Sequence, residues 1–300
     1  MIFFSLQERP LENLKYVNLS HCELITKLPK LWAPNLESLV LAGCENLVKL
    51  IGLGAPNLEY LDLSFCENLV EIDECFGSLE KLTKWFLDGC RKLQILPSQF
   101  RLKSLYSFYL RDCSSLEKLP NFHPEMECLK TLDSGGSGIR EVPSSIEHLT
   151  TLEKLILYKC KNLGDLPDSI YKLQQLRYFY TPTAKLRPTC DSFDGSSGYG
   201  FVNMKELNFW GYEGIIELDL LMKPDYFPKL ETIDLSDTNI VTIPESISRF
   251  PRLIGLDASN CKLLREIQGL PQVIRAVDVD NSMLLNTSPS GLFNQVSLFL

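Results

Sequence analysis

The chain has 300 residues, of which 45% are hydrophobic and 23% are charged, which is the composition of a soluble globular protein. Its net charge is −8, and its 38 acidic and 30 basic residues are mixed along the chain without forming blocks. An acidic surface without a stripe of Lys and Arg argues against a nucleic-acid backbone as partner. No apolar run approaches the roughly 18 residues that a membrane helix needs. We therefore expect neither nucleic acid nor membrane as a partner.

Apolar residues recur along the chain at a fixed spacing. Counted from Leu36, they stand three, five, eleven and fourteen positions later, with Cys44 at the eighth position. Three copies of this frame are one residue shorter after the eighth position and have Ser, Ala or Thr in place of the Cys. The mean spacing is roughly 24 residues, within the range of leucine-rich repeats. The frame starts at Leu14, Leu36, Leu58, Leu82, Leu105, Leu129, Leu152, Leu176, Met204, Leu230, Leu253 and Ile274.

Each repeat is predicted to contain one short strand, because its third and fifth positions alternate with polar ones, as in a strand with one buried face. The eleventh and fourteenth positions then fill the interior from the return segment. The segments 143–149 and 167–173, each opened by a proline, predict one turn of helix or 3-10 helix. The predicted fold is an α/β leucine-rich repeat solenoid, or horseshoe. Its concave side is a parallel sheet, and its convex side consists of short helical, 3-10 and loop segments.

The repeats divide the chain into three expected parts. Residues 1–13 form a partial N-terminal cap, residues 14–285 form the array of about twelve repeats, and residues 286–300 form a C-terminal cap or the start of a post-repeat segment. A loop insertion is expected at about 187–203, in the stretch richest in Gly and Ser. Because a solenoid needs its open ends covered and the N-terminal cap is thin, we expect the chain to be cut from a longer protein.

The cysteines follow the repeat. The three histidines are scattered and no C-x₂-C pair occurs, so no zinc site is expected. A disulfide ladder is disfavoured, because each cysteine could pair with only one of its neighbours. We predict instead a small, buried, weakly hydrogen-bonding side chain that closes the turn after each strand. Buried free thiols indicate a reducing compartment. Seven of the ten cysteines share the eighth position: Cys22, Cys44, Cys66, Cys90, Cys113, Cys160 and Cys261.

Motifs for catalysis or phosphate binding are missing. The chain has no G-x-x-x-x-G-K-[ST], H-E-x-x-H or G-x-S-x-G sequence, and no G-x-G-x-x-G opening a helix. The nearest glycine-rich sequence, Gly135-Gly-Ser-Gly138, lacks a lysine and is interpreted as a loosened turn at a strand exit. With three scattered histidines, a Ser or Cys nucleophile would have no recognisable base. We expect no enzymatic activity, no cofactor and no metal.

The predicted fold does offer a concave sheet surface. Residues two, four, six and seven positions after each start point outward there. Exposed aromatic side chains flanked by charges are typical of hot spots in protein interfaces. The candidate protein-binding residues are Tyr60, Phe65, Lys84, Phe86, Tyr109, Arg111, Lys154, Tyr158, Lys159, Tyr178, Tyr180 and Trp210.

Several phrases of the repeat resemble a known family. They are Pro10-Leu-Glu-Asn-Leu-Lys-Tyr-Val-Asn-Leu-Ser-His-Cys22, the stretch Leu-Asp-Leu-Ser-Phe-Cys66-Glu-Asn-Leu-Val, and the sequences Val142-Pro-Ser-Ser-Ile146 and Leu166-Pro-Asp-Ser-Ile170. They resemble the leucine-rich repeat region of plant intracellular immune receptors that carry an N-terminal TIR domain and a central nucleotide-binding domain. The ending 270–281 resembles the transition out of the repeats in that class. The resemblance covers residues 10–285.

This resemblance implies a disease-resistance role in plant innate immunity and signal transduction. It implies recognition of pathogen effectors or of host proteins that effectors modify. It also implies restraint of the receptor's nucleotide switch, with the receptor's own nucleotide-binding domain as a partner. The implied location is the cytoplasm, with the nucleus as a second compartment. Because the TIR and nucleotide-binding domains are absent from this chain, no NADase or ATPase activity carries over to it.

Two other classes of protein use the same repeat. A cytosolic signalling scaffold or ubiquitin-ligase substrate adaptor is the main alternative, although no F-box precedes the repeats. An extracellular receptor ectodomain is the other. The missing signal peptide, the absent paired flanking cysteines and the series of free thiols all count against it.

Overall fold

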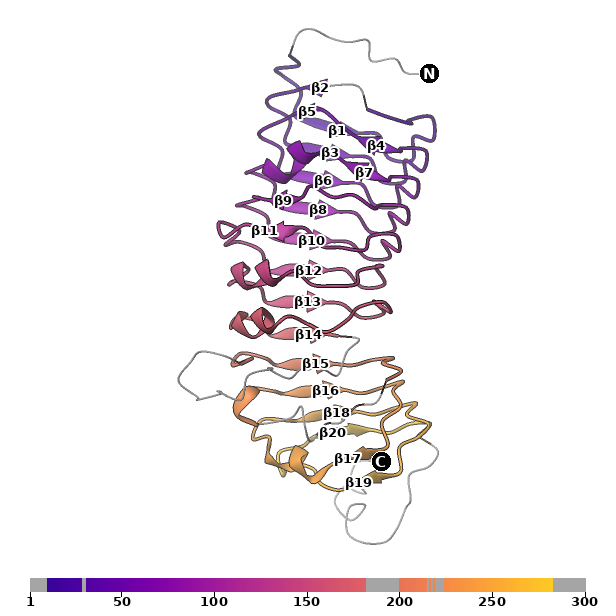
Figure 1. Ribbon diagram of the computed structural model, residues 1–300, viewed down its shortest axis with the longest axis vertical. Coiled ribbons are helices and arrows are strands. Elements are labelled where there is room, and N and C mark those ends of the chain that lie inside the picture. The colour runs from indigo at the N-terminus through magenta and orange to yellow at the C-terminus, as the bar shows by residue number, and fades with distance from the viewer. Residues whose placement is uncertain are drawn as a thin grey trace.

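The computed structural model describes residues 10–28, 31–181, 200–214, 216, 218 and 224–282. These residues form an elongated stack of coils around one parallel sheet of twelve strands (Figure 1). The strands follow one another in chain order, and their register aligns equivalent positions of the frame, so that Leu39 pairs with Val17 on one side and Leu61 on the other. The predicted solenoid with a parallel sheet is confirmed. Most of the insertion at 187–203, and the whole segment 286–300, lie outside the described residues.

Every predicted repeat contributes one strand, and each strand begins two residues after a predicted start. In their order across the sheet the strands are β1 (Tyr16–Asn18), β3 (Ser38–Val40), β6 (Tyr60–Asp62), β8 (Lys84–Phe86), β10 (Ser107–Tyr109), β12 (Thr131–Asp133), β13 (Lys154–Ile156), β14 (Tyr178–Tyr180), β15 (Glu206–Asn208), β16 (Thr232–Asp234), β18 (Gly255–Asp257) and β20 (Ala276–Asp278).

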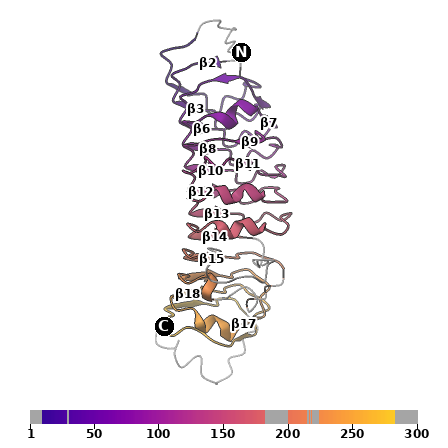
Figure 2. The same ribbon diagram turned by 60° about the vertical axis from the view of Figure 1, so that its left-hand side comes forward.

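The return side of the coils carries short, irregular elements (Figure 2). Within the described residues, four two-stranded parallel sheets pair β2 (Leu31–Trp32) with β5 (Leu53–Gly54), β4 (Lys49–Leu50) with β7 (Glu71–Ile72), β9 (Gln99–Phe100) with β11 (Asn121–Phe122), and β17 (Thr242–Ile243) with β19 (Glu266–Ile267). The 3-10 helices are η1 (Glu74–Ser78), η2 (Ser144–His148), η3 (Asp168–Lys172), η4 (Pro224–Tyr226) and η5 (Glu245–Arg249). Helices η2 and η3 confirm the two predicted turns, and in each a proline precedes the first residue.

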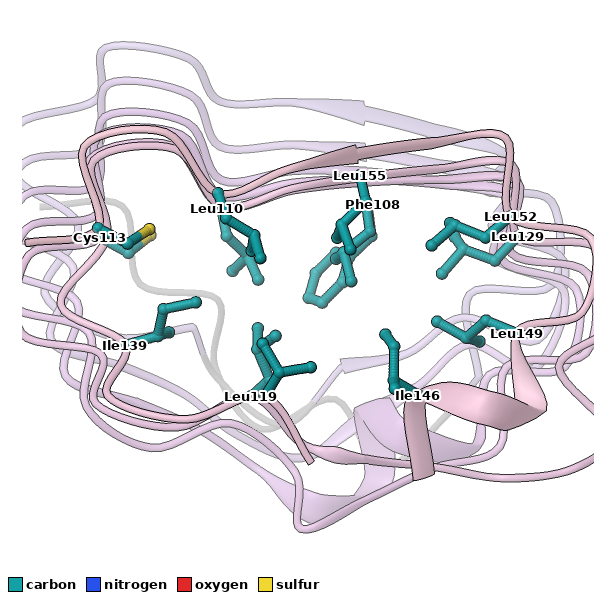
Figure 3. Close-up of a cluster of buried hydrophobic side chains, with 14 of the residues drawn as sticks. Phe108, Leu110, Cys113, Leu119, Leu129, Ile139, Ile146, Leu149, Leu152 and Leu155 are labelled. Carbon is teal, nitrogen blue, oxygen red and sulfur yellow. The ribbon is translucent and has the colours of Figure 1, made fainter. Parts of the chain in front are cut away.

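The core runs through the interior of the coils, and Figure 3 shows one section of it. Phe108 and Leu155 point inward from the sheet, while Leu119 and Ile146 reach them from the return side. Cys113 closes one end of this section. All of these side chains are buried, because each coil covers the apolar face of the next. The third position of the frame therefore supplies the centre of the core, as its spacing predicts.

The cysteine at the eighth position closes the turn after the strand, as predicted. Its thiol donates a hydrogen bond to a backbone carbonyl of the preceding repeat: the Sγ of Cys113 lies 3.2 Å from the oxygen of Leu87. The serine at the same position of the last repeat donates an equivalent bond, from Ser282 Oγ to the oxygen of Ala258 at 2.7 Å. Each of the nine cysteines among the described residues has a free thiol. The Leu87 carbonyl also accepts the N–H of Cys90, so the thiol adds a second hydrogen bond to it, which links one coil to the next.

The glycine-rich sequence 135–138 contains the predicted turn at a strand exit, since residues 135 and 136 form a turn after β12, but this turn is tightly packed and not loosened. Gly138 is buried, and a Cβ built on it would stand closer than 3.0 Å to the backbone oxygen of Ser114. Gly136 has a φ of 72°, a conformation that glycine adopts without strain. The ring of Tyr158 occupies the space that a side chain on Gly135 would need. The three glycines permit close contact between neighbouring coils.

Candidate protein-binding surface

The solvent side of the twelve-stranded sheet, with the turns that follow its strands, forms one continuous surface, called here the sheet face. It consists of the second, fourth, sixth and seventh positions of each repeat. All twelve candidate residues lie on it and none is buried. Phe65, Lys84, Arg111 and Lys159 are exposed, and the other eight are half-buried. Half-burial arises because neighbouring strands place equivalent side chains only about 4.8 Å apart, so adjacent side chains cover one another.

Three of the aromatic candidates form a continuous ladder across β6, β8 and β10. The ring centroids of Tyr60 and Phe86 are 5.4 Å apart. Those of Phe86 and Tyr109 are 5.0 Å apart, with the rings stacked at an interplanar angle of 7°. Stacked rings on adjacent strands restrict one another's rotamers. This aromatic ladder is therefore a preformed apolar surface, with the exposed Lys84 on β8 beside it.

Phe65 lies on the turn that follows β6, and 59% of its surface is exposed. It occupies the seventh position of its repeat. That position has a φ between 56° and 74° in all eleven repeats where the structure describes it. Gly, Asn and Asp tolerate this conformation, whereas it strains an aromatic residue. The ring of Phe65 lies over Gly89, where any side chain would collide with it. The fold thus presents a large apolar side chain in a strained position.

Arg111 is anchored by a carboxylate that sequence reasoning missed. Its Nε donates to Asp133 Oδ2 at 2.5 Å, and its backbone N–H donates to Asp88 Oδ1 at 2.9 Å. The side chain of Asp133 is fully buried, whereas 44% of the Arg111 side chain is exposed. Burial raises the pKa of Asp133, and Arg111 opposes this shift. The guanidinium is therefore held in one orientation while part of it faces solvent. The sequence feature that could have pointed to Asp133 is the Leu-Asp pair at positions three and four of its repeat.

The remaining candidates gather around two cation–π contacts over β13 to β15. Lys154 places its Nζ 5.4 Å from the ring centroid of Tyr180. Lys159 places its Nζ 4.4 Å from the ring centroid of Trp210. Tyr178 stands between Lys154 and Glu206 in the register of the sheet. The sheet face therefore arranges eleven candidates in two groups, with the twelfth, Arg111, between them.

The C-terminal third of the sheet face is acidic, which sequence reasoning also missed. Across β15, β16, β18 and β20 and the turns that follow, the described residues carry no Lys or Arg at the outward positions. The net charge of the whole chain does not reveal this acidic zone, because the balancing basic residues lie at other positions of the frame. The acidic residues are Glu206, Asp234, Asp237, Asp257, Asp278 and Asp280.

Among the described residues, no group of three His, Cys, Asp or Glu could hold a metal ion. Within the same residues, no helix is both long enough and apolar enough to cross a bilayer. What the arrangement offers is a surface with aromatic, cationic and acidic zones.

Comparison with known proteins identifies the family. A family model described as "Disease resistance protein RPS4B-like, leucine-rich repeats" matches residues 101–290, and a "Leucine Rich Repeat" model matches 13–34 and 57–79. The chain is 29% identical over 261 residues to "TMV resistance protein N" of Nicotiana glutinosa, covering 72% of this chain and 23% of that protein. It is 35% identical over 188 residues to "Disease resistance protein RML1A" of Arabidopsis thaliana, covering 62% of this chain and 18% of that protein. The chain thus spans less than a quarter of either relative.

Solved structures share the fold at lower identity. The functional domain of InlJ from Listeria monocytogenes, described as including a cysteine ladder, aligns with a TM-score of 0.51 at 14% identity, covering 91% of this chain and 67% of that one. The structure of TLR13 in complex with ssRNA13 aligns with a TM-score of 0.50 at 18% identity, covering 90% of this chain and 42% of that one.

The stacked coils and their recurring frame define a leucine-rich repeat protein. Since the disease-resistance model covers well over half of the chain, the chain belongs to the leucine-rich repeat region of TIR-type nucleotide-binding disease resistance proteins of plants. Such domains are typically non-enzymatic modules that bind other proteins in immunity.

Proposed function

We propose that the sheet face recognises a protein in plant defence, either a pathogen effector or a host protein that an effector modifies. The observation that carries this proposal is the pair of half-buried aromatic clusters on either side of an anchored arginine. Aromatic residues and arginine dominate the energetics of protein interfaces. Because stacking and burial already hold these side chains in place, binding orders few of them and loses little conformational entropy.

Recognition of this protein partner would also regulate activation of the receptor. In a full-length receptor, a contact between this domain and the receptor's nucleotide-binding domain would restrain the nucleotide switch, and partner binding would release it. The leucine-rich repeat domain would then contribute binding energy and no catalysis of its own. A location in the cytoplasm, with the nucleus as a second compartment, accords with the series of buried free thiols, because reducing compartments preserve them.

The experiment that tests this function compares two charge-reversal variants of the full chain. The face variant replaces Lys84 and Lys154 with Glu, and Lys159 is left unchanged. The control replaces Lys81 and Lys161 with Glu; both are exposed and lie outside the outward positions of the sheet. Arg111 is left unchanged because it neutralises the buried Asp133. Each variant is used to capture proteins from infected and uninfected leaf extracts, and circular dichroism checks its fold.

We expect the wild-type chain and the control to retain the same proteins, identified by mass spectrometry, and the face variant to lose them. Restoring Lys at the two positions should restore capture. If the folded face variant captures the same proteins as the control, the sheet face is not the recognition surface and the proposal fails.

A further inference from the structure

Two aromatic side chains of the sheet face converge although their repeats are not adjacent. Tyr158 follows β13 and Trp210 follows β15, and β14 lies between these strands. Strands two apart in a sheet are roughly 9.6 Å apart, yet the ring centroids of Tyr158 and Trp210 are 5.8 Å apart, with the rings tilted by 51°. The two rings therefore lean toward each other across the intervening repeat.

Both rings are held by their surroundings. The Tyr158 ring lies against Gly135, so closely that a Cβ there would stand 3.0 Å from its Cζ. The indole Nε1 of Trp210 donates a hydrogen bond to Asp237 Oδ2 at 2.9 Å. Because a neighbouring repeat fixes each ring, the pair is formed before any partner binds. We call this pair the cation seat, for the contact described next.

A lysine of the chain itself occupies the cation seat. The Nζ of Lys159 lies 4.4 Å from the Trp210 centroid and 5.8 Å from the Tyr158 centroid. Within the described residues the structure records no carboxylate paired with this ammonium. Lys159 has a φ of 57°, a strained value for a long side chain, whereas Asn260 and Asn281 hold the same position in later repeats. The rings attract the ammonium, and it stays exposed and free to leave.

The surface next to the cation seat is acidic. Glu206 lies in the same repeat as Trp210, and the other five carboxylates of the C-terminal third of the sheet face lie beyond it, with no Lys or Arg at the outward positions described. At Asp257 and Asp278, the Oδ1 atom accepts all of the recorded hydrogen bonds. The donors belong to Ser259 and Asp280, in the turns that follow the two strands. The Oδ2 atoms of Asp257 and Asp278 are left to accept bonds from a partner.

We propose that the sheet face from Tyr158 to the last repeat binds a basic segment of a partner protein, rich in Lys or Arg. Lys159 holds the cation seat until a cationic side chain of that segment replaces it. Aromatic faces attract ammonium and guanidinium groups, and the neighbouring carboxylates complement the remaining charges of the segment. An acidic segment would be repelled. This inference rests on the proposed function and specifies the chemistry of the partner at one end of the face.

The test measures binding of a fluorescein-labelled peptide of alternating Arg and Ser to the full chain by fluorescence anisotropy, with an alternating Glu and Ser peptide as the acidic counterpart. Lys159→Asn empties the cation seat and introduces a residue that the chain itself uses at this turn. Lys161→Asn is the matched control, since it removes the same charge from an exposed position two residues away. Trp210→Leu keeps apolar bulk and removes the aromatic face. Thermal melts confirm that each variant folds.

We expect Lys159→Asn to bind the basic peptide roughly two- to fivefold more tightly than Lys161→Asn does. Trp210→Leu should weaken binding and abolish the gain from Lys159→Asn in the double variant. Equal gains from the two Asn variants, or tighter binding of the acidic peptide, would overturn the inference. If that happens while the face variant still loses its captured proteins, the proposed function stands and only the basic partner and the exchange of Lys159 are refuted.

Discussion

Gly138 is a position where one added methyl group should be costly. It is buried, and its N–H donates to the oxygen of Cys113 at 3.1 Å. A Cβ there would stand under 3.0 Å from Ser114 O, 3.0 Å from Ser114 C and 3.2 Å from Leu116 O. All three are backbone atoms, so no side chain can rotate away and the two coils must separate. Overpacking costs about 1–3 kcal/mol, and weakening a buried hydrogen bond adds about 1 kcal/mol, so we expect Gly138→Ala to lower the free energy of unfolding by about 2–4 kcal/mol.

Urea unfolding followed by far-ultraviolet circular dichroism measures this loss. The matched control is Gly164→Ala, because a Cβ on the exposed Gly164 meets only Arg140 O, at 3.4 Å, which is an ordinary contact. We expect the control to stay within about 0.5 kcal/mol of the wild-type chain. Equal stability of the two variants would refute the reasoning that close approach of the coils requires glycine at 138.

Three further predictions concern the thiols and the strained turn. Burial raises the pKa of Cys66 to about 12. The folded state therefore favours the protonated thiol, whose contribution to stability is complete below about pH 9 and is lost as the pH rises toward 12. Between pH 8 and pH 10 this thiol should account for a loss of about 1.4 kcal/mol, so Cys66→Ser should lose about that much less than the wild-type chain. Equal losses in the two proteins would contradict this. Phe65→Asn should raise the free energy of unfolding by about 0.5–1 kcal/mol, because Asn tolerates the φ of 59°. A destabilised variant would mean that packing of the ring on Gly89 outweighs the strain. Iodoacetamide should label the exposed Cys128 in the native protein and spare the buried thiols, so early labelling of Cys113 on peptide mapping would count against the described core.

Much of the fold could be predicted from spacing, because each coil is a local structure that repeats. The frame placed all twelve strands, and the prolines at 143 and 167 placed η2 and η3. The role of the cysteine at the turn could also be predicted from the frame, because a small residue that recurs once per coil at a fixed position has the same surroundings in each coil. The left-handed conformation of the seventh position was not predicted, although Gly, Asn and Asp recur there, because Phe65 and Lys159 mask the pattern.

The sequence by itself determined which side of the sheet each side chain occupies, because alternation along a strand is a local property of the backbone. Only the tertiary structure decided which of those side chains meet. The burial of Asp133 beneath Arg111 and the convergence of Tyr158 with Trp210 depend on how side chains lean across neighbouring coils. The close approach at Gly138 likewise depends on the distance between two coils. These contacts join residues about 22 or more positions apart, and the repeat spacing aligns such residues without setting the directions or desolvation of their side chains.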